Sequence, residues 1–420
     1  MLLISMALNG LRQTFGSPNM LLGVIERILP GLFASPLFLT ASFISGGCFM
    51  RPVRFTRPVD IEQYMTDQKE HLHASTSRIR DFEVFDFNYV PAKPLMREEL
   101  KPVIDALLRY QQTGIANNVL ILGARGSGKS MLARYLMRVM ASEGQPIFAY
   151  ANCRQHNTSF KILASLLGLP ARGCSLDEHW QRFEAAHAGK VVFVLDEVDL
   201  INDREKRHDI LYLISRSARN HMAVLLSNNP KFLNVLDEST RSTLQPEIIH
   251  FGTYSAGEME AILTDRAKIG LQSVPQQAIA EIAAMTAKHT NSDVRVAIKT
   301  LYLSALEPDL PLRQHFEKAR RDIMFDVVKD LNDKNLLILK AAQATPDGLA
   351  KGVYESYQQI STRCQEEPLS YMAFYSTLSY LQSLGLVVLL STKVNRAYTN
   401  RVQLTFDPSI LQTIIQVRFA

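Results

Sequence analysis

A phosphate-binding loop is the feature of this sequence that most restricts its fold. The loop follows the apolar run 119–122 and precedes a run of helix-forming residues, which matches the strand–GxxxxGK[ST]–helix pattern. Its residues are, in order, Gly123, Ala124, Arg125, Gly126, Ser127, Gly128, Lys129 and Ser130. Glycines let backbone N–H groups surround a phosphate, and the positive end of the following helix adds to the attraction. We therefore expect Lys129 to reach the β- and γ-phosphates of a nucleotide, and the Ser130 hydroxyl to bind Mg²⁺.

A second motif lies further along the chain. The segment 190–195, which is continuously apolar from Val191 onward, predicts a buried parallel strand, and it ends in Asp196 and Glu197. A carboxylate at the carboxyl end of a strand beside a phosphate loop lies where a nucleotide-bound Mg²⁺ needs a ligand, so we expect Asp196 to serve the metal. Glu197 is suited to orient or deprotonate an attacking water. The alternative is that these acids only cap the next helix, a role that also suits Asp199. Together the motifs indicate a protein that hydrolyses a nucleotide or is switched by one.

Length and composition set the broad class. The 420 residues predict two or three domains, and 47% hydrophobic with 21% charged residues is ordinary for a globular protein. The formal net charge of +5 permits a nucleic-acid partner without requiring one. The four cysteines are scattered, which indicates neither a disulfide framework nor a zinc site and suits a reducing cytoplasm.

The N-terminal region, residues 1–54, is an atypical apolar extension. Residues 28–50 contain no charged side chain and are long enough to span a bilayer, but prolines and glycines interrupt them. We prefer a start of translation at Met50, and we expect no membrane partner. The alternative is a membrane anchor.

The rest of the chain divides by pattern into three regions. In 55–253, an N-terminal arm precedes strands that alternate with helices, which predicts an α/β domain with a doubly wound parallel sheet. The pattern in 254–311 is helical and predicts a small lid. In 312–420, helices near 334–344, 351–363 and 369–384 precede strands at 386–390 and 402–406, an arrangement typical of a winged helix.

Three further motifs carry a family resemblance. Tyr89 and Val90, followed by Arg97, precede the phosphate loop; Asn228 ends the apolar run 222–226; and Arg295 lies in the sequence Asn-Ser-Asp-Val-Arg. With the phosphate loop, these motifs resemble the AAA+ ATPases of replication initiation, over residues 80–415. The specific likeness is to the archaeal origin-recognition/cell-division-cycle type, which is related to eukaryotic origin recognition complex subunits.

The resemblance implies roles for these residues. Tyr89, Val90 and Arg97 would lie beside the adenine, Asn228 would sense the γ-phosphate, and Arg295 would reach the nucleotide from the lid. Plainer alternatives are that Asn228 caps a turn, that Arg295 pairs with Asp293 or a surface acid, and that Arg97 is a helix-surface charge. We expect ATP or ADP with Mg²⁺ between the sheet domain and the lid, and the contacts to include Met131, Tyr254 and Arg266.

One departure from the family concerns an arginine that acts on a neighbour's nucleotide. Ser239 stands at the aligned position, and Arg241 is nearby. Either Arg241 replaces the missing residue or the contact between copies is absent. A missing arginine of this kind costs about 10³–10⁵ in rate, so we expect slow hydrolysis and retention of ADP.

The C-terminal region predicts contacts with duplex DNA. On the third helix, Met372, Leu378, Leu381 and Leu384 mark an expected core face, while Tyr371, Tyr375 and Ser379 form a second face suited to a major groove. The expected loop between the strands supplies Lys393, Asn395, Arg396, Tyr398 and Arg401. Arg172 falls where the family inserts a DNA-contacting helix. The alternative for the basic loop is a solvated turn.

We expect an ATP-dependent replication initiator that binds origin DNA, helps to load the replicative helicase and self-associates on DNA in the cytoplasm, at the nucleoid. Two alternatives remain open. One is an AAA+ ATPase of a mobile element or plasmid, and the other is a nucleotide-switched DNA-binding regulator without a replication role.

Overall fold

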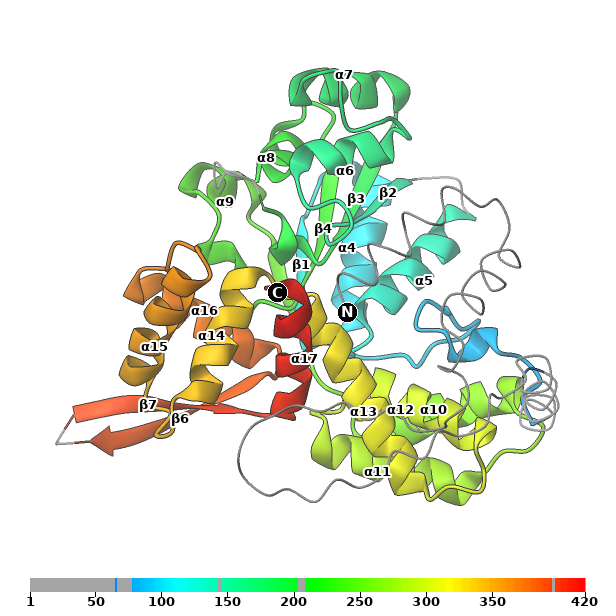
Figure 1. The fold of residues 1–420 in the computed structure, drawn as a ribbon. Coiled ribbons are helices and arrows are strands. Elements are labelled where there is room, and N and C mark those ends of the chain that lie inside the picture. The colour runs from blue at the N-terminus through cyan, green and yellow to red at the C-terminus, as the bar shows by residue number, and fades with distance from the viewer. Residues whose placement is uncertain (1–64, 66–77, 143–145, 203–207, 395–396, 420) are drawn as a thin grey trace, which may run out of the picture. The chain divides into compact units, whose positions relative to one another are not determined.

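The computed structural model describes residues 65, 78–142, 146–202, 208–394 and 397–419 (Figure 1). The expectations for residues 1–54, among them the start at Met50 and the alternative membrane anchor, lie outside the described residues. Within the described ranges, no helix combines the length and the apolar character needed to cross a membrane.

A five-stranded parallel sheet forms the first part of the fold. Its strand order is β2-β3-β4-β1-β5, and every neighbouring pair is parallel. The strands are β1 (Val119–Gly123), β2 (Ile147–Asn152), β3 (Val191–Asp196), β4 (Met222–Ser227) and β5 (Glu247–Phe251). The predicted α/β class with a parallel sheet is therefore confirmed. Strand β5 was not predicted, because at the sheet edge it buries Ile249 and Phe251 but exposes Ile248 and His250, so it lacks a continuous apolar run.

Helices cover both faces of this sheet. One core packs α4 (Leu100–Thr113) and α5 (Lys129–Ala141) on the sheet, and the other packs α6 (Ser159–Leu166), α7 (Leu176–Ala186) and α8 (Asp209–Arg216) on the opposite face (Figure 1). Within β3, Val192 and Val194 belong to the first core, whereas Phe193 and Leu195 belong to the second. A strand that is buried on both faces has to be apolar at every position, which explains the run that predicted it.

Three helices follow the sheet. They are α10 (Ala256–Gly270), α11 (Gln276–His289) and α12 (Val294–Leu306), as the helical pattern predicted. A capping box of Ser255 and Glu258 begins α10, and the Asp293 side chain caps α12. The short helix η1 (Glu83–Phe85) packs on α10, where the Arg266 guanidinium donates to the carbonyl oxygen of Val84.

The C-terminal region is a winged helix, as predicted. After α13 (Leu312–Lys329), it contains the elements α14 (Asp333–Ala344), α15 (Ala350–Arg363), α16 (Tyr371–Ser383), β6 (Val387–Val394), β7 (Ala397–Leu404) and α17 (Pro408–Arg418). The antiparallel ladder extends from Val387–Leu404 to Val394–Ala397, so most of the expected loop 391–401 belongs to the strands. The hairpin projects from the domain, and polar side chains on it do not interrupt the pairing of its backbone (Figure 1). The polar composition of 391–401 therefore predicted strands that were too short.

The predicted core face of α16 needs one correction. Met372 is 83% exposed, and the buried positions of the helix are Phe374, Leu378 and Leu381. These three follow the i, i+4, i+7 spacing of one helix face, whereas Met372 lies two residues before Phe374 and therefore points elsewhere.

Candidate functional site

A pocket lies where the phosphate loop meets the ends of β3 and β4 and the helices α10 and α12. It is lined by fourteen of the side chains and loop positions that the sequence predicted: Tyr89, Arg125, Gly126, Ser127, Gly128, Lys129, Ser130, Met131, Asp196, Glu197, Asn228, Tyr254, Arg266 and Arg295. Val90, Arg97, Gly123 and Ala124 lie next to this pocket in the chain but do not line it.

The glycines of the loop are required by geometry. Gly126 and Gly128 have φ angles of +74° and +87°, in the left-handed region that disfavours other residues. A Cβ at Gly128 would collide with the Tyr254 hydroxyl, and one at Gly126 would collide with the Asp293 carboxylate. The loop therefore packs tightly against the lid.

Lys129 is held over the loop by four acceptors, of which the Ser127 hydroxyl is the most distant at 3.5 Å. Its Nζ donates to the carbonyl oxygens of Gly123 (2.8 Å) and Ala124 (2.9 Å) and to Oδ1 of Asn228 (3.0 Å). Burial lowers the pKa of Lys129 from its ordinary value to about 8. The turn that follows is capped instead by Asn229, whose Oδ1 accepts from the backbone N–H of Lys231. Asn228 therefore faces the lysine of the phosphate loop, and its sensing role stays a prediction.

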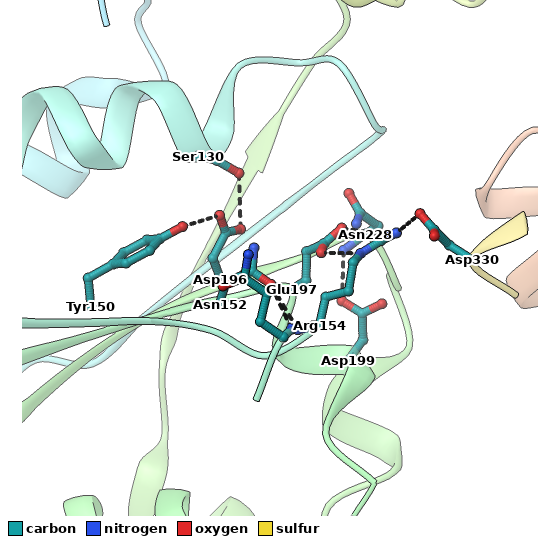
Figure 2. A network of polar contacts seen from close by, with 10 residues as sticks. Ser130, Tyr150, Asn152, Arg154, Asp196, Glu197, Asp199, Asn228 and Asp330 are labelled. Atoms are coloured by element: carbon teal, nitrogen blue, oxygen red, sulfur yellow. Dashed lines mark hydrogen bonds and ion pairs between the residues drawn. The ribbon is translucent and has the colours of Figure 1, made fainter. Parts of the chain in front are cut away.

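The side chains of Ser130 and Asp196 bring two oxygen-bearing groups together (Figure 2). The Ser130 hydroxyl donates to Oδ1 of Asp196 (3.0 Å), and the Tyr150 hydroxyl donates to Oδ2 (3.0 Å). Burial raises the pKa of Asp196. A hydroxyl and a buried carboxylate at this distance are ligands that suit Mg²⁺, so the residues fit the predicted ion.

Glu197 is engaged by an arginine that the sequence did not single out. Arg154 donates from Nε to Oε2 (2.7 Å) and from Nη2 to Oε1 (2.8 Å) of Glu197, and its Nη1 pairs with Asp330 (Figure 2). Glu197 itself has φ +55°, a strained backbone conformation for a residue with a side chain. The only sequence signal for Arg154 is its place just after the apolar run of β2, because the ends of β2 and β3 meet at one edge of the sheet.

Asp199 connects β3 to β4 and does not cap a helix. Its Oδ1 accepts from the Ser227 hydroxyl (2.7 Å) and from the backbone N–H of Asn228 (3.1 Å). Burial raises the pKa of Asp199. The carboxylate thus fixes the end of β4, which carries Asn228 into the pocket.

The lid arginine adopts the plainer of the two predicted arrangements. Arg295 lines the pocket, but its Nε and Nη2 donate to Oδ1 (2.9 Å) and Oδ2 (2.5 Å) of Asp293. The guanidinium of Arg266 lies 5.1 Å from the Tyr89 ring centroid and binds the backbone of Val84. Burial lowers the pKa of Arg266 to about 10.

Arg97 supports the loop from outside the pocket. It donates to the carbonyl oxygens of Ser127 (3.2 Å) and Gly252 (3.1 Å), and it pairs with Glu99 (2.9 Å). Its guanidinium also lies 4.6 Å from the Tyr254 ring centroid. Because only 5% of Arg97 is exposed, the alternative of a helix-surface charge is wrong.

The residues predicted to contact DNA divide into two groups. Lys393, Tyr398 and Arg401 are exposed on the wing, Tyr398 at 80%, and the Lys393 ammonium lies 5.8 Å from the Tyr398 ring centroid. Asn395 and Arg396 lie outside the described residues. On α16, Tyr371 is 44% exposed and Tyr375 is half-buried, while Ser379 accepts from Nζ of Lys231 (3.4 Å) in the sheet domain.

Arg172, the remaining DNA candidate, is exposed in the turn that precedes α7. Residues 170–175 form no helix in the structure, and the helix begins at Leu176. Arg172 is therefore presented by a loop and not by an inserted helix.

Comparison with known proteins agrees with this geometry. Residues 93–227 match a family described as AAA ATPase domain. The ORC1-type DNA replication protein 1 of Sulfurisphaera tokodaii is 28% identical over 347 residues, which cover 74% of this chain and 86% of that protein. That of Archaeoglobus fulgidus is 25% identical over 381 residues, which cover 83% and 93%. The predicted family resemblance is confirmed.

Solved structures give the same fold. The Aeropyrum pernix ORC1 protein, determined in complex with DNA, superposes with a TM-score of 0.60 at 24% identity and covers 81% of this chain and 97% of its own. Cdc6p from Pyrobaculum aerophilum superposes with a TM-score of 0.50 at 21% identity and covers 82% and 100%. The chain thus shares the origin-recognition fold from its AAA ATPase domain to its winged helix.

Proposed function

We propose that this protein is an ATP-dependent initiator of DNA replication that binds duplex DNA at an origin. The observation that carries the proposal is the union, in one chain, of a phosphate loop with its Ser130–Asp196 pair and a winged helix with an exposed basic hairpin. The curated relatives that cover most of this chain are ORC1-type DNA replication proteins, and the Aeropyrum pernix ORC1 protein was determined with DNA.

ATP and ADP bind in the pocket together with Mg²⁺. Ser130 and Asp196 hold the ion, which would neutralise charge on the β- and γ-phosphates. Lys129 contacts the same phosphates, Asn228 and Arg295 report their presence, and Glu197 orients the attacking water. Hydrolysis is slow because Arg154 engages both oxygens of Glu197 and hinders that carboxylate from contacting the attacking water.

The winged helix grips DNA through its wing and α16. Lys393 and Arg401 bind phosphates, Tyr398 reaches the minor groove, and Tyr371 with Tyr375 faces the major groove. Asn395 and Arg396, which lie outside the described residues, keep their predicted role as DNA contacts. Several copies gather on origin DNA in the cytoplasm, at the nucleoid, and recruit the replicative helicase.

Selection of bound sequences from random duplex DNA, with ATP and with ADP, tests the DNA side. We expect a defined site and a different affinity in the two nucleotide states. A chromatin footprint then separates the rival functions: occupancy of repeats at a replication origin supports initiation, whereas occupancy of promoters or element ends overturns it in favour of a regulator or a mobile-element ATPase.

Two substitutions test the DNA contacts directly. Lys393→Ala and Arg401→Ala should each weaken binding to all sequences and reduce the salt dependence by about one phosphate contact. Lys268→Ala on α10, a lysine that is also exposed, is the matched control. Equal affinity for the wing variants and the control would contradict DNA binding by the wing.

Nucleotide retention tests the ATPase side. Lys129→Ala should abolish retention of ATP and ADP during gel filtration, because the phosphates lose their only lysine contact in the loop. Unchanged ATP affinity in this variant would overturn the assignment of the pocket.

A further inference from the structure

The phosphate loop carries a guanidinium that the roles described above leave unused. Arg125 is the third residue of the loop, and its side chain lines the nucleotide pocket. Its Nε is buried without a hydrogen-bond partner among the described residues. Within the same ranges, the guanidinium forms neither a hydrogen bond nor an ion pair. An unpaired, desolvated cation is costly to keep, unless an anion completes its environment.

The two arginines whose charges act on Arg125 are already neutralised. Arg295 is chelated by Asp293, and Arg154 is held between Glu197 and Asp330. Arg125 therefore differs from both in having no acidic partner among the described side chains.

The surroundings of Arg125 indicate where its anion would lie. Burial and the nearby charge of Arg154 lower the pKa of Arg125, while Glu197 and Tyr380 act in the opposite direction. The guanidinium is thus within electrostatic range of Glu197, the residue that orients the attacking water. The group placed between a loop arginine and that water in an ATP complex is the γ-phosphate, whose oxygens a guanidinium binds in bidentate fashion.

We propose that Arg125 is a catalytic residue that binds the γ-phosphate of the ATP held by its own chain and stabilises the charge that develops during hydrolysis. The inference rests on the proposed ATP hydrolysis. Water forms a bond to the γ-phosphorus while the bond from that phosphorus to the bridging oxygen breaks. The electron pair of the broken bond stays on ADP, and Glu197 takes the proton of the water before it passes to solvent. Arg125 neutralises the γ-phosphate oxygens throughout.

This role makes hydrolysis a property of one chain. Ser239 occupies the place where an arginine for a neighbour's nucleotide was expected, and Arg241 is exposed on α9 (Glu238–Leu244). With Arg125 supplying the charge in cis, neither position is required for turnover.

Single-turnover hydrolysis, measured over a wide range of chain concentrations, tests the proposal. We expect Arg125→Ala to slow hydrolysis by about 10²-fold, Arg125→Lys to slow it less, and ADP affinity to stay unchanged because ADP lacks the γ-phosphate. Arg182→Ala on α7, an exposed arginine, is the control for removal of a positive charge. The wild-type rate per chain should not change on dilution, and Arg241→Ala should hydrolyse at the wild-type rate.

A binding measurement complements the rate. ADP with aluminium fluoride, which mimics the transferred phosphoryl group, should be retained by dilute wild-type protein more tightly than ADP alone. Arg125→Ala should lose that difference, although thermal unfolding with ADP shows the variant to be folded.

The outcomes separate this inference from the proposed function. Wild-type hydrolysis at full rate in Arg125→Ala, or retention of aluminium fluoride by that variant, overturns the role of Arg125 and leaves ATP hydrolysis intact. A rate that rises with chain concentration and depends on Arg241 overturns it as well. Wild-type protein that binds ATP but never hydrolyses it refutes the proposed hydrolysis itself, and the role of Arg125 with it.

Discussion

Single side chains of the pocket are arranged for a ligand with several negative charges. Lys129 is buried among carbonyl and amide oxygens, Arg125 has no acidic partner among the described residues, and Asp196 is a buried carboxylate beside a hydroxyl. Lys129 and Asp196 attract each other only in part, because burial still lowers the pKa of the lysine and raises that of the carboxylate. A nucleotide with its cation would supply the remaining counter-charge.

The affinity for ATP should depend on pH through Lys129. Burial lowers the pKa of Lys129 to about 8 in the free protein, whereas bound phosphates favour the charged ammonium and raise that pKa. The affinity for ATP is therefore highest at pH values below the pKa of Lys129 in the free protein. It falls by up to about tenfold per pH unit as the pH rises above that pKa. Isothermal titration calorimetry across this range measures the effect. In Lys129→Arg the charge cannot titrate, so a fall of the same size in that variant would assign the titration to another group.

Gly128→Ala should abolish nucleotide binding. The added Cβ meets the Tyr254 hydroxyl, and φ is +87°, so the loop must move off the lid. Gly173→Ala is the matched control, because its φ of +85° carries the same backbone strain but no atom lies within 4 Å of the added Cβ. We expect Gly173→Ala to cost about 1 kcal/mol in unfolding free energy and to leave ADP affinity unchanged. Equal losses of affinity in the two variants would attribute the loss to general destabilisation by backbone strain and not to the contact with Tyr254.

At the scale of elements, the start of α12 does two things at once. Asp293 caps the helix by accepting from the backbone N–H of Arg295 (3.0 Å), and it chelates the side chain of the same arginine. The carboxylate also lies against Gly126 of the phosphate loop. Asp293 therefore affects two properties: the stability of α12, and the positive charge that Arg295 of the lid presents to the nucleotide.

Asp293→Asn and Asp293→Ala should separate these effects. Asparagine still caps the helix but carries no charge, so we expect stability close to wild type and an ATP affinity that rises a few-fold as Arg295 is released. Alanine removes the cap and should lower the unfolding free energy by about 1 kcal/mol. Thermal unfolding and calorimetry measure the two properties. Weaker ATP binding in Asp293→Asn would mean that Arg295 needs its partner to be positioned.

At the scale of the whole molecule, one arginine joins the ATPase site to the segment that enters the winged helix. Arg154 follows β2, pairs with Glu197 at the end of β3, and pairs with Asp330 directly after α13 (Figure 2). A further contact, between Lys231 and Ser379 of α16, joins the same two regions. A movement of the winged helix on DNA would therefore change the position of the Glu197 side chain through Arg154.

Arg154→Met should release Glu197 and speed up ATP hydrolysis by up to about fivefold, the equivalent of an ion pair of about 1 kcal/mol. Duplex DNA should change the turnover of the wild type but not that of Arg154→Met, because Arg154 no longer connects Asp330 with Glu197. Arg219→Met is a closely matched control, since Arg219 also pairs with a glutamate at 2.7 Å and is 37% exposed, against 30% for Arg154. A slower reaction in Arg154→Met would mean that Arg154 itself contacts the phosphates.

Local patterns in the sequence were sufficient to predict the phosphate loop, four of the five strands, the three lid helices and the winged helix. Each depends on neighbours in the chain: glycines at left-handed positions, apolar runs buried on both faces, or a repeat of 3.6 residues. The meeting of Ser130 and Asp196 was also predictable, because each residue lies in such a local pattern.

Other features depend on contacts between distant segments, and only the tertiary structure decided them. Three such features join residues that no local periodicity relates. They are the edge strand β5, the pairing of Arg154 with Glu197 and Asp330, and the hydrogen bond that fixes the end of β4 to Asp199. The choice of Asp293 as the partner of Arg295 was one of several that the sequence allowed. Charged side chains are long and can reach many partners, so their pairing follows from where the folded backbone places them and not from their spacing in the chain.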